Sequence, residues 1–199
     1  FIREYVPLRR IVHKKLPHKI SKEIMTYAVP VALTLFVMVV ITNIDVVLVK
    51  HYADDVAAGE YSVGAVISRV AVFVPGVLLT VLFPQVSQNS ADGKSSIMTL
   101  AVVMGLTILL SGSLLLIILF FPEFIIKLFF GEKYIAASEV LVIISLAMSV
   151  VAVLGVIFNF LLAKRMYAFL YVSYAILFVS GGYIYAVDSF EVIELIYVI

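Results

Sequence analysis

The sequence predicts an all-α integral membrane protein, a bundle of membrane-spanning helices, and three observations support this fold class. Of the 199 residues, 64% are hydrophobic and only 14% are charged, against roughly 45–50% and about 25% in soluble domains. Long apolar runs recur along the chain, and the basic residues are concentrated on alternate connections between them. A chain of this length has too much surface to bury that many apolar side chains in its own core. Lipid must therefore solvate much of it.

The apolar runs predict five full spans and a truncated sixth, because crossing a hydrocarbon core of about 30 Å takes about 20 helical residues. Helices are expected because unpaired backbone groups are costly in lipid, and the alternating pattern of barrel strands is absent. We therefore expect a basic segment, 1–23, followed by a helical bundle, 24–199, in an excerpt from a longer protein. The spans are predicted at about 24–49, 56–83, 97–121, 134–163, 167–187 and 190–199.

Polar stretches predict the connections, and their charges predict the orientation. Loops are expected at 50–55 and 84–96, a short interfacial helix within 122–133, and a tight basic turn at Lys164-Arg165. Ten of the 14 basic residues lie on the side of the N-terminal segment, and three lie on the opposite side. Because cytoplasmic loops carry the excess of Lys and Arg, we expect a multi-pass protein of the cytoplasmic (inner) membrane with residues 1–23 in the cytoplasm.

The basic segment itself allows two interpretations. Between Pro7 and Pro17 the apolar residues fall near one helical face, which is typical of a short interfacial helix at an anionic leaflet. The alternative is a solvated basic linker. A basic cluster can also bind nucleic acid, but beside a membrane span its commonest meaning is an orientation signal. Membrane lipid, and not nucleic acid, is the expected partner.

Motifs of the common enzyme classes are absent from the sequence. It contains no G-x-S-x-G, H-E-x-x-H, Walker loop or G-x-G-x-x-G. There is no cysteine, and the spacing of the three histidines brings them to no common point. We therefore predict no catalytic residue, no metal site and no cofactor.

Arg69 is the strongest candidate for a functional residue. It lies about halfway through the second predicted span among apolar neighbours, where inserting an arginine costs about 2.5–3.5 kcal/mol. A partner or a water-filled cavity is therefore expected. The donor fork of arginine suits phosphate, so Arg69 fits a cationic contact for an anionic substrate. The alternative is a structural ion pair.

Polar residues towards the end of the first span complete the candidate substrate-binding cavity. Asp45 is the natural partner of Arg69, although it could instead bind a coupling ion or reach the outer interface. Asn43 lies two residues earlier, and Lys50 is at the helix end, where a boundary charge is the commoner role.

Two further features of the second span concern its shape and packing. Pro75-Gly76 predicts a kink, because proline removes a backbone donor and clashes with the preceding turn. A kinked helix that carries an intramembrane arginine is what a transporter gate could use. The small residues Gly64 and Ser68 allow another helix to approach closely.

Several phrases resemble polysaccharide exporters of the multidrug/oligosaccharidyl-lipid/polysaccharide (MOP) superfamily. They follow one another in order over most of the chain and include VP (29–30), NIDVVLVKHY (43–52), AGEYSV (58–63), VLFPQVS (81–87), LFFGEKY (128–134) and AA (136–137). The resemblance implies the second lobe of a two-lobed transporter whose first lobe, missing here, would be its partner. Members of this superfamily flip polyprenyl-diphosphate-linked oligosaccharides to the outer leaflet for polysaccharide biosynthesis. The implied substrate is therefore a lipid-linked oligosaccharide, and Arg69 is the matching position for its diphosphate.

Two other functions stay open on the sequence alone. A cation-coupled antiporter of the related multidrug-extrusion family would use Asp45 to bind the driving ion. A membrane-embedded oligosaccharide polymerase or ligase would need large periplasmic loops with catalytic residues, and the predicted loops are short.

Overall fold

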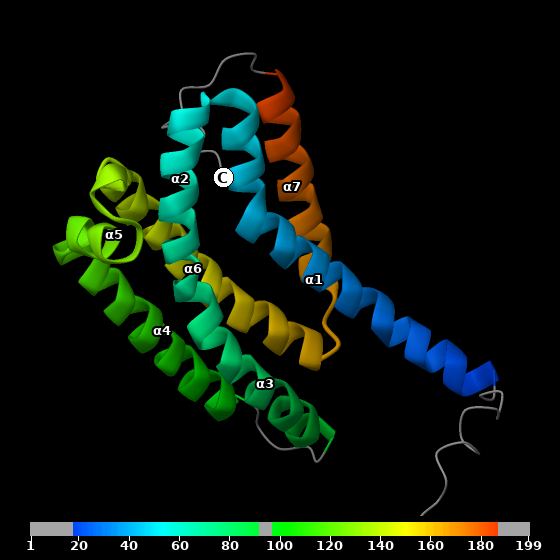
Figure 1. Ribbon diagram of the computed structural model, residues 1–199. Coiled ribbons are helices and arrows are strands. Elements are labelled where there is room, and N and C mark those ends of the chain that lie inside the picture. Colours follow the sequence, from blue (N-terminus) through cyan, green and yellow to red (C-terminus); the bar gives the residue numbers. More distant parts are fainter. Residues whose placement is uncertain (1–17, 92–96, 187–199) are drawn as a thin grey trace, which may run out of the picture.

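The computed structural model describes residues 18–91 and 97–186, and every regular element within these ranges is a helix (Figure 1). In chain order the elements are α1 (His18–Tyr52), α2 (Asp55–Ser68), α3 (Val70–Ala91), α4 (Ile97–Phe120), α5 (Pro122–Phe130), the 3-10 turn η2 (Glu132–Tyr134), α6 (Ala137–Ala163) and α7 (Ala168–Ala186). The predicted all-α class is confirmed for this part of the chain.

Four helical stretches within the described ranges are long and apolar enough to cross a membrane. They are Ile24–Tyr52, Asp55–Leu78, Ile97–Phe120 and Ala137–Ala163, and they coincide with the first four predicted spans. The fifth predicted span is a helix, α7, but its apolar portion Ala168–Gly182 is shorter than these four. That α7 crosses the membrane stays a prediction. The predicted sixth span at 190–199 and the interfacial helix between Pro7 and Pro17 lie outside the described residues.

The second predicted span consists of two helices that meet at Arg69. The amide groups of Val72 and Phe73 both donate to the carbonyl of Arg69, at 3.0 Å each. An amide that bonds to the residue three positions earlier tightens the turn in the manner of a 3-10 helix, so α2 and α3 are separated at this residue. The helix then runs without interruption through Pro75-Gly76. A bend at Pro75-Gly76 stays a prediction.

The connections differ from their predicted bounds in two places. The loop expected to begin at residue 84 is wrong in its first part, because α3 contains Pro84 and continues to Ala91. Proline is tolerated inside membrane helices where neighbouring groups satisfy the backbone that it frees. The short helix expected within 122–133 is confirmed as α5, and α6 begins at Ala137, three residues later than predicted.

Helix α6 lies at the centre of the bundle. It packs most extensively against α2, α3 and α4 and also touches α1 and α5, while α7 packs against α1 (Figure 1). Twelve of its residues are buried. The outward faces of the other helices are apolar, as at Phe73 (70% exposed) and Leu109 (65% exposed). Large exposed apolar surfaces are unusual on soluble monomers, whereas lipid accommodates them.

Small residues allow α2 and α6 to approach closely, as predicted. A Cβ atom at Gly64 would lie 3.3 Å from the backbone nitrogen of Leu141, closer than ordinary packing permits. One turn further on, the hydroxyls of Ser68 and Ser145 are 3.0 Å apart, and Ser68 also donates to the Gly64 carbonyl at 2.7 Å. The contact therefore satisfies its own polar groups without water.

Candidate functional site

The site lies between α1 and the junction of α2 with α3. On α1 the buried residues Val37, Asp45 and Val49 are spaced by eight and four positions, so they lie on one face of the helix. That face is turned towards α2 and α6, which α1 contacts. The carboxylate of Asp45 is therefore directed into the bundle, and its side chain is only 2% exposed.

Helix α2 presents two polar side chains to this carboxylate. Tyr61 and Arg69 are eight residues apart, which places them on the same face of a helix two turns apart. Tyr61 is buried, and the Arg69 side chain is 13% exposed. Apolar residues surround the pair, because Tyr61 belongs to a core cluster with Val49, Ala65 and others.

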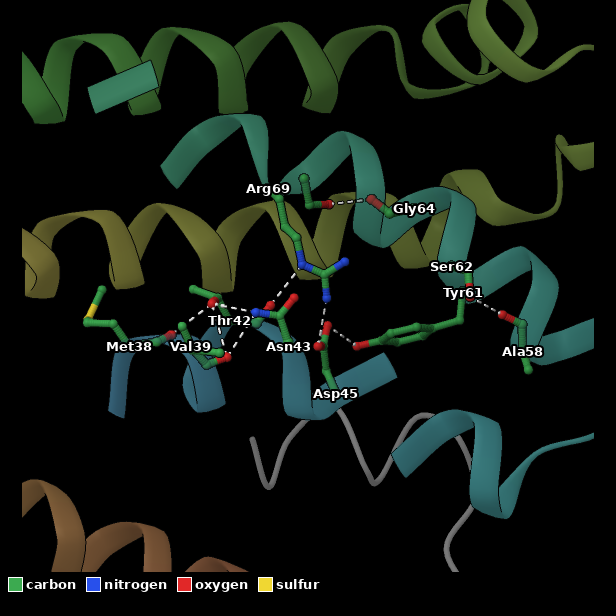
Figure 2. Close-up of polar contacts among 11 residues, drawn as sticks. Met38, Val39, Thr42, Asn43, Asp45, Ala58, Tyr61, Ser62, Gly64 and Arg69 are labelled. Carbon is green, nitrogen blue, oxygen red and sulfur yellow. Dashed lines mark hydrogen bonds and ion pairs between the residues drawn. The ribbon is translucent and has the colours of Figure 1, made fainter. Parts of the chain in front are cut away.

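Four groups from the two helices form one hydrogen-bonded cluster, which Figure 2 shows in close-up. Arg69 Nη2 donates to Asp45 Oδ1 at 2.9 Å, and the Tyr61 hydroxyl donates to Asp45 Oδ2 at 3.1 Å. Arg69 Nε donates to the backbone carbonyl of Thr42 at 2.8 Å. Both carboxylate oxygens of Asp45 are therefore engaged, and the guanidinium is fixed to α1 at two points. The predicted pairing of Asp45 with Arg69 is direct.

The pairing within the cluster explains how two charged side chains can be buried in a membrane-spanning part of the chain. An isolated buried charge is costly, and it is retained when it is paired and hydrogen-bonded. Asp45 and Arg69 cancel each other's charge, so the cluster is neutral as a whole. Within residues 18–91 and 97–186, Arg69 Nη1 has no hydrogen-bond partner. The side chain is partly accessible, and the guanidinium therefore keeps donors with which it could contact a ligand.

Asn43 is beside the cluster without joining it. Its side-chain amide donates within α1, to the Val39 carbonyl and to Thr42 Oγ1, both at 2.9 Å, and the residue is exposed. Because these bonds are local to one helix, the structure does not connect Asn43 to Arg69. The Thr42 hydroxyl likewise donates within its own helix, to the Met38 carbonyl at 2.7 Å.

The structure places Lys50 outside the cluster. Its ammonium group forms an ion pair with Asp55 across the turn between α1 and α2, and both side chains are exposed. Asp54 caps α2 in the same turn, where its carboxylate accepts from the Ala57 amide at 3.3 Å. The geometry is that of a boundary charge at a helix end. Pro75 and Gly76 lie on α3, beyond Arg69, and line an apolar pocket.

Sequence reasoning missed Tyr61 and Thr42 as members of the site. The sequence could have indicated Tyr61, because it precedes Arg69 by two helical turns and a buried tyrosine hydroxyl usually needs a hydrogen-bond partner. It could not have indicated Thr42, since its contribution to Arg69 is a backbone carbonyl. Any residue type at that position would offer the same oxygen atom.

In a comparison with known protein families, residues 2–90 match the family described as polysaccharide biosynthesis protein. Residues 2–90 carry the family's sequence pattern. The resemblance to polysaccharide exporters is thereby confirmed, and the matched range contains Thr42, Asp45, Tyr61 and Arg69. The family is of a membrane-transporter type. No curated protein and no solved structure matches the chain.

Proposed function

We propose that this protein flips polyprenyl-diphosphate-linked oligosaccharides across the cytoplasmic membrane, with Arg69 as the contact for the diphosphate. The observation that carries the proposal is the position of Arg69. It is a largely buried cation within the second candidate span, inside the part of the chain that matches the family. A polyprenyl diphosphate carries its negative charge at the end of an apolar chain, so its acceptor has to combine a cation with membrane depth.

The chemistry of the cluster suits reversible binding of such an anion. Diphosphate oxygens accept from the planar fork of arginine in the same geometry as a carboxylate. The anion would therefore compete with Asp45 for the guanidinium, or bind first at Nη1. Tyr61 and the Thr42 carbonyl would keep Asp45 and Arg69 in place while partners exchange. Each state of the exchange then retains hydrogen bonds at both charges.

The proposed direction of transport follows from the charge distribution. We place residues 1–23 and the turn at Lys164-Arg165 on the cytoplasmic side, because that side carries most of the basic residues. The helix order agrees with this assignment of sides. Helices α3 and α6 end towards one end of the bundle, and α1 and α4 end towards the other (Figure 1). Substrate would thus reach Arg69 from the side of the α1 N-terminus. The first lobe of the same protein would supply the opposite wall of the cavity.

The alternative function, a cation-coupled multidrug antiporter, is less well supported by the geometry. It requires Asp45 to bind a driving ion, yet both of its carboxylate oxygens already accept from Arg69 and Tyr61. An incoming cation would have to displace a guanidinium that has a second anchor at Thr42. The pairing therefore favours the exporter.

A neutral version of the ion pair tests the proposal. In the double variant Asp45→Asn with Arg69→Gln, both side chains keep hydrogen-bonding groups while the charges are removed. We expect export of surface polysaccharide to fall by at least about tenfold, because a buried charge-assisted contact to the ligand is lost. Lipid-linked oligosaccharide should accumulate on the cytoplasmic leaflet. Normal export from the double variant, at a normal level of protein in the membrane, would rule out Arg69 as the diphosphate contact.

Lys50→Gln is the matched control, because it removes a cation from a site that the structure places outside the cluster. Export should be unchanged. Should the double variant fail to accumulate in the membrane, Arg69→Lys replaces it, since lysine keeps the charge but lacks the planar fork. Reduced export by Arg69→Lys supports the diphosphate contact, and full export by it contradicts a role for the fork.

A further inference from the structure

An apolar pocket lies between α1, α3 and α6, on the α3 side of the charged cluster. Its volume is about 350 Å³, at the lower end of the range for ligand-binding pockets. Its lining is almost wholly apolar and includes Met38 from α1, Phe73, Pro75 and Gly76 from α3, and Gly155 and Val156 from α6. The pocket is partly open to the surroundings of the bundle, because its lining residues Phe73 and Val77 are 70% and 67% exposed.

The pocket is adjacent to Arg69 along both helices that form the cluster. On α3, the amide of the pocket residue Phe73 donates to the Arg69 carbonyl at 3.0 Å. On α1, the Met38 carbonyl accepts from the hydroxyl of Thr42, and the carbonyl of Thr42 holds Arg69 Nε. One helical turn on each helix therefore separates the cation from the apolar lining.

Gly76 leaves the pocket open, and Gly155 borders it beneath the end of Met38. A Cβ atom at Gly76 would have nothing within 4 Å, so this glycine is not needed for contact with a neighbouring helix. At Gly155 a Cβ atom would approach only Met38 Cε, at 3.2 Å, which is the far end of a flexible side chain. Gly64 differs, because a Cβ atom there would meet the backbone of α6. Gly76 therefore leaves open volume in the pocket, whereas Gly64 allows two helices to pack closely.

We propose that this pocket holds the isoprene units next to the diphosphate of the lipid carrier while Arg69 binds the diphosphate. This assignment rests on the proposed function and adds a subsite for the chain to the subsite for the head group. We choose this ligand because a cation, Arg69, and an apolar pocket lie one helical turn apart. Only a ligand that is anionic at one end and hydrocarbon immediately beyond it occupies both.

The pocket would select its ligand by shape. Lipid tails are as apolar as the lining, so transfer from the bilayer into the pocket has no hydrophobic gain. Affinity must then come from the charge at Arg69 and from close packing of the chain. A methyl-branched isoprenoid projects side groups that can enter the open space over Gly76, whereas a straight acyl chain leaves that space empty. Voids of this kind forfeit dispersion contacts.

Photo-crosslinking of the full-length protein in phosphatidylcholine nanodiscs tests the assignment. The probe is farnesyl diphosphate with a diazirine on its first isoprene unit, and labelled peptides are identified by mass spectrometry. We expect label on the peptides that contain Met38 and Gly76. Unlabelled farnesyl diphosphate should compete about tenfold or more better than a straight-chain alkyl diphosphate of equal length, because a methyl group in an apolar pocket is worth that much in discrimination. Equal competition, or label confined to other helices, would overturn the proposal.

Gly76→Leu fills the pocket from a position with free space and should abolish labelling at Met38. Gly105→Leu is the control, because Gly105 lies on α4, away from the pocket, and also has nothing within 4 Å of a Cβ atom. If Gly76→Leu does not fold, Gly155→Ala narrows the pocket by pushing Met38 into it and should reduce labelling. Undiminished labelling at Met38 in the variant that folds contradicts the assignment.

Export assays separate failure of the pocket from failure of the proposed function. If the neutral Asp45→Asn, Arg69→Gln pair stops export while Gly76→Leu and Gly155→Ala export and label like the wild type, the chain subsite is refuted and the flippase function stands. If the neutral pair exports normally, the proposed diphosphate contact fails, and the chain subsite that depends on it fails with it. Loss of export in both classes of variant supports both.

Discussion

Helix α2 contacts α6 and α1 through two different kinds of interaction. Towards α6 it offers Gly64 and Ser68, and the two backbones come so close that a single methyl group would press on the backbone of Leu141. Towards α1 it offers Tyr61 and Arg69, whose long side chains reach across to Asp45. The contact with α6 uses small, uncharged residues, and the contact with α1 uses long side chains and an ion pair.

The two contacts should therefore respond differently to a ligand. The contact between α2 and α6 depends on close packing and on uncharged hydroxyl groups, and no anion or cation competes for it. The contact with α1 depends on an ion pair, for which a charged ligand can substitute one partner. In the proposed transport cycle, α2 and α6 would therefore form a constant part of the bundle, and substrate would alter the attachment of α1.

The sharpest way to break the α1 contact is to remove one charge. Arg69→Ala leaves Asp45 buried without a cation, and we expect a loss of stability of about 3–5 kcal/mol. Denaturation by an ionic detergent, followed by far-UV circular dichroism, measures this loss. Adding Asp45→Asn should recover much of it, because the buried charge is then gone. Equal stability of Arg69→Ala and the wild type would show that the ion pair does not stabilise the bundle.

Breaking the α2 contact with α6 should have the next largest effect. Gly64→Leu forces the helices apart at Leu141, and overpacking of this kind typically costs about 1–3 kcal/mol. The same denaturation assay applies, with Gly105→Leu as the control for added bulk at an open position. Ligand binding at Arg69 should not change the cost of Gly64→Leu, since the packing contact does not depend on charge. A cost that varies with ligand would contradict the separation of the two contacts.

The smallest effects come from deleting one hydroxyl on each face. Ser68→Ala should cost about 0.6 kcal/mol, the average for interhelical hydrogen bonds in membranes. Tyr61→Phe should cost more, about 1.5 kcal/mol, because its hydroxyl bonds to an ionised carboxylate. Each variant removes one hydroxyl group, and the difference between their denaturation midpoints compares a bond to a carboxylate with bonds to uncharged groups. A larger cost for Ser68→Ala would reverse the comparison.

Much of the fold was predictable because hydrophobicity and length determine where a helix can cross a membrane. The stretches 97–121 and 134–163 were predicted to within a few residues of α4 and α6. The end of α3 was not, because Pro84 and the polar residues after it are typical of a loop, whereas the backbone there is helical to Ala91. Local composition cannot show which freed backbone groups find partners in neighbouring helices.

The candidate site was predictable in part for a similar reason. A charge at membrane depth requires a partner, and this requirement alone pairs Arg69 with Asp45. The same argument gives no information about a backbone carbonyl such as that of Thr42, nor about the direction of an amide such as that of Asn43. Those depend on the rotation of each helix about its own axis. That rotation is set by packing against α6, which is distant in sequence.

The junction of α2 with α3 has one mechanical consequence. Arg69 is both the cation and the residue at which the two helices meet. When two rods tilt about a joint, points far from the joint sweep through long arcs while the joint itself hardly moves. A rearrangement of α3 relative to α2 would therefore displace Ala91, at the far end, much more than it displaces the Arg69 backbone. In the proposed flippase, the Arg69 guanidinium could therefore stay with the diphosphate while the rest of α3 changes position.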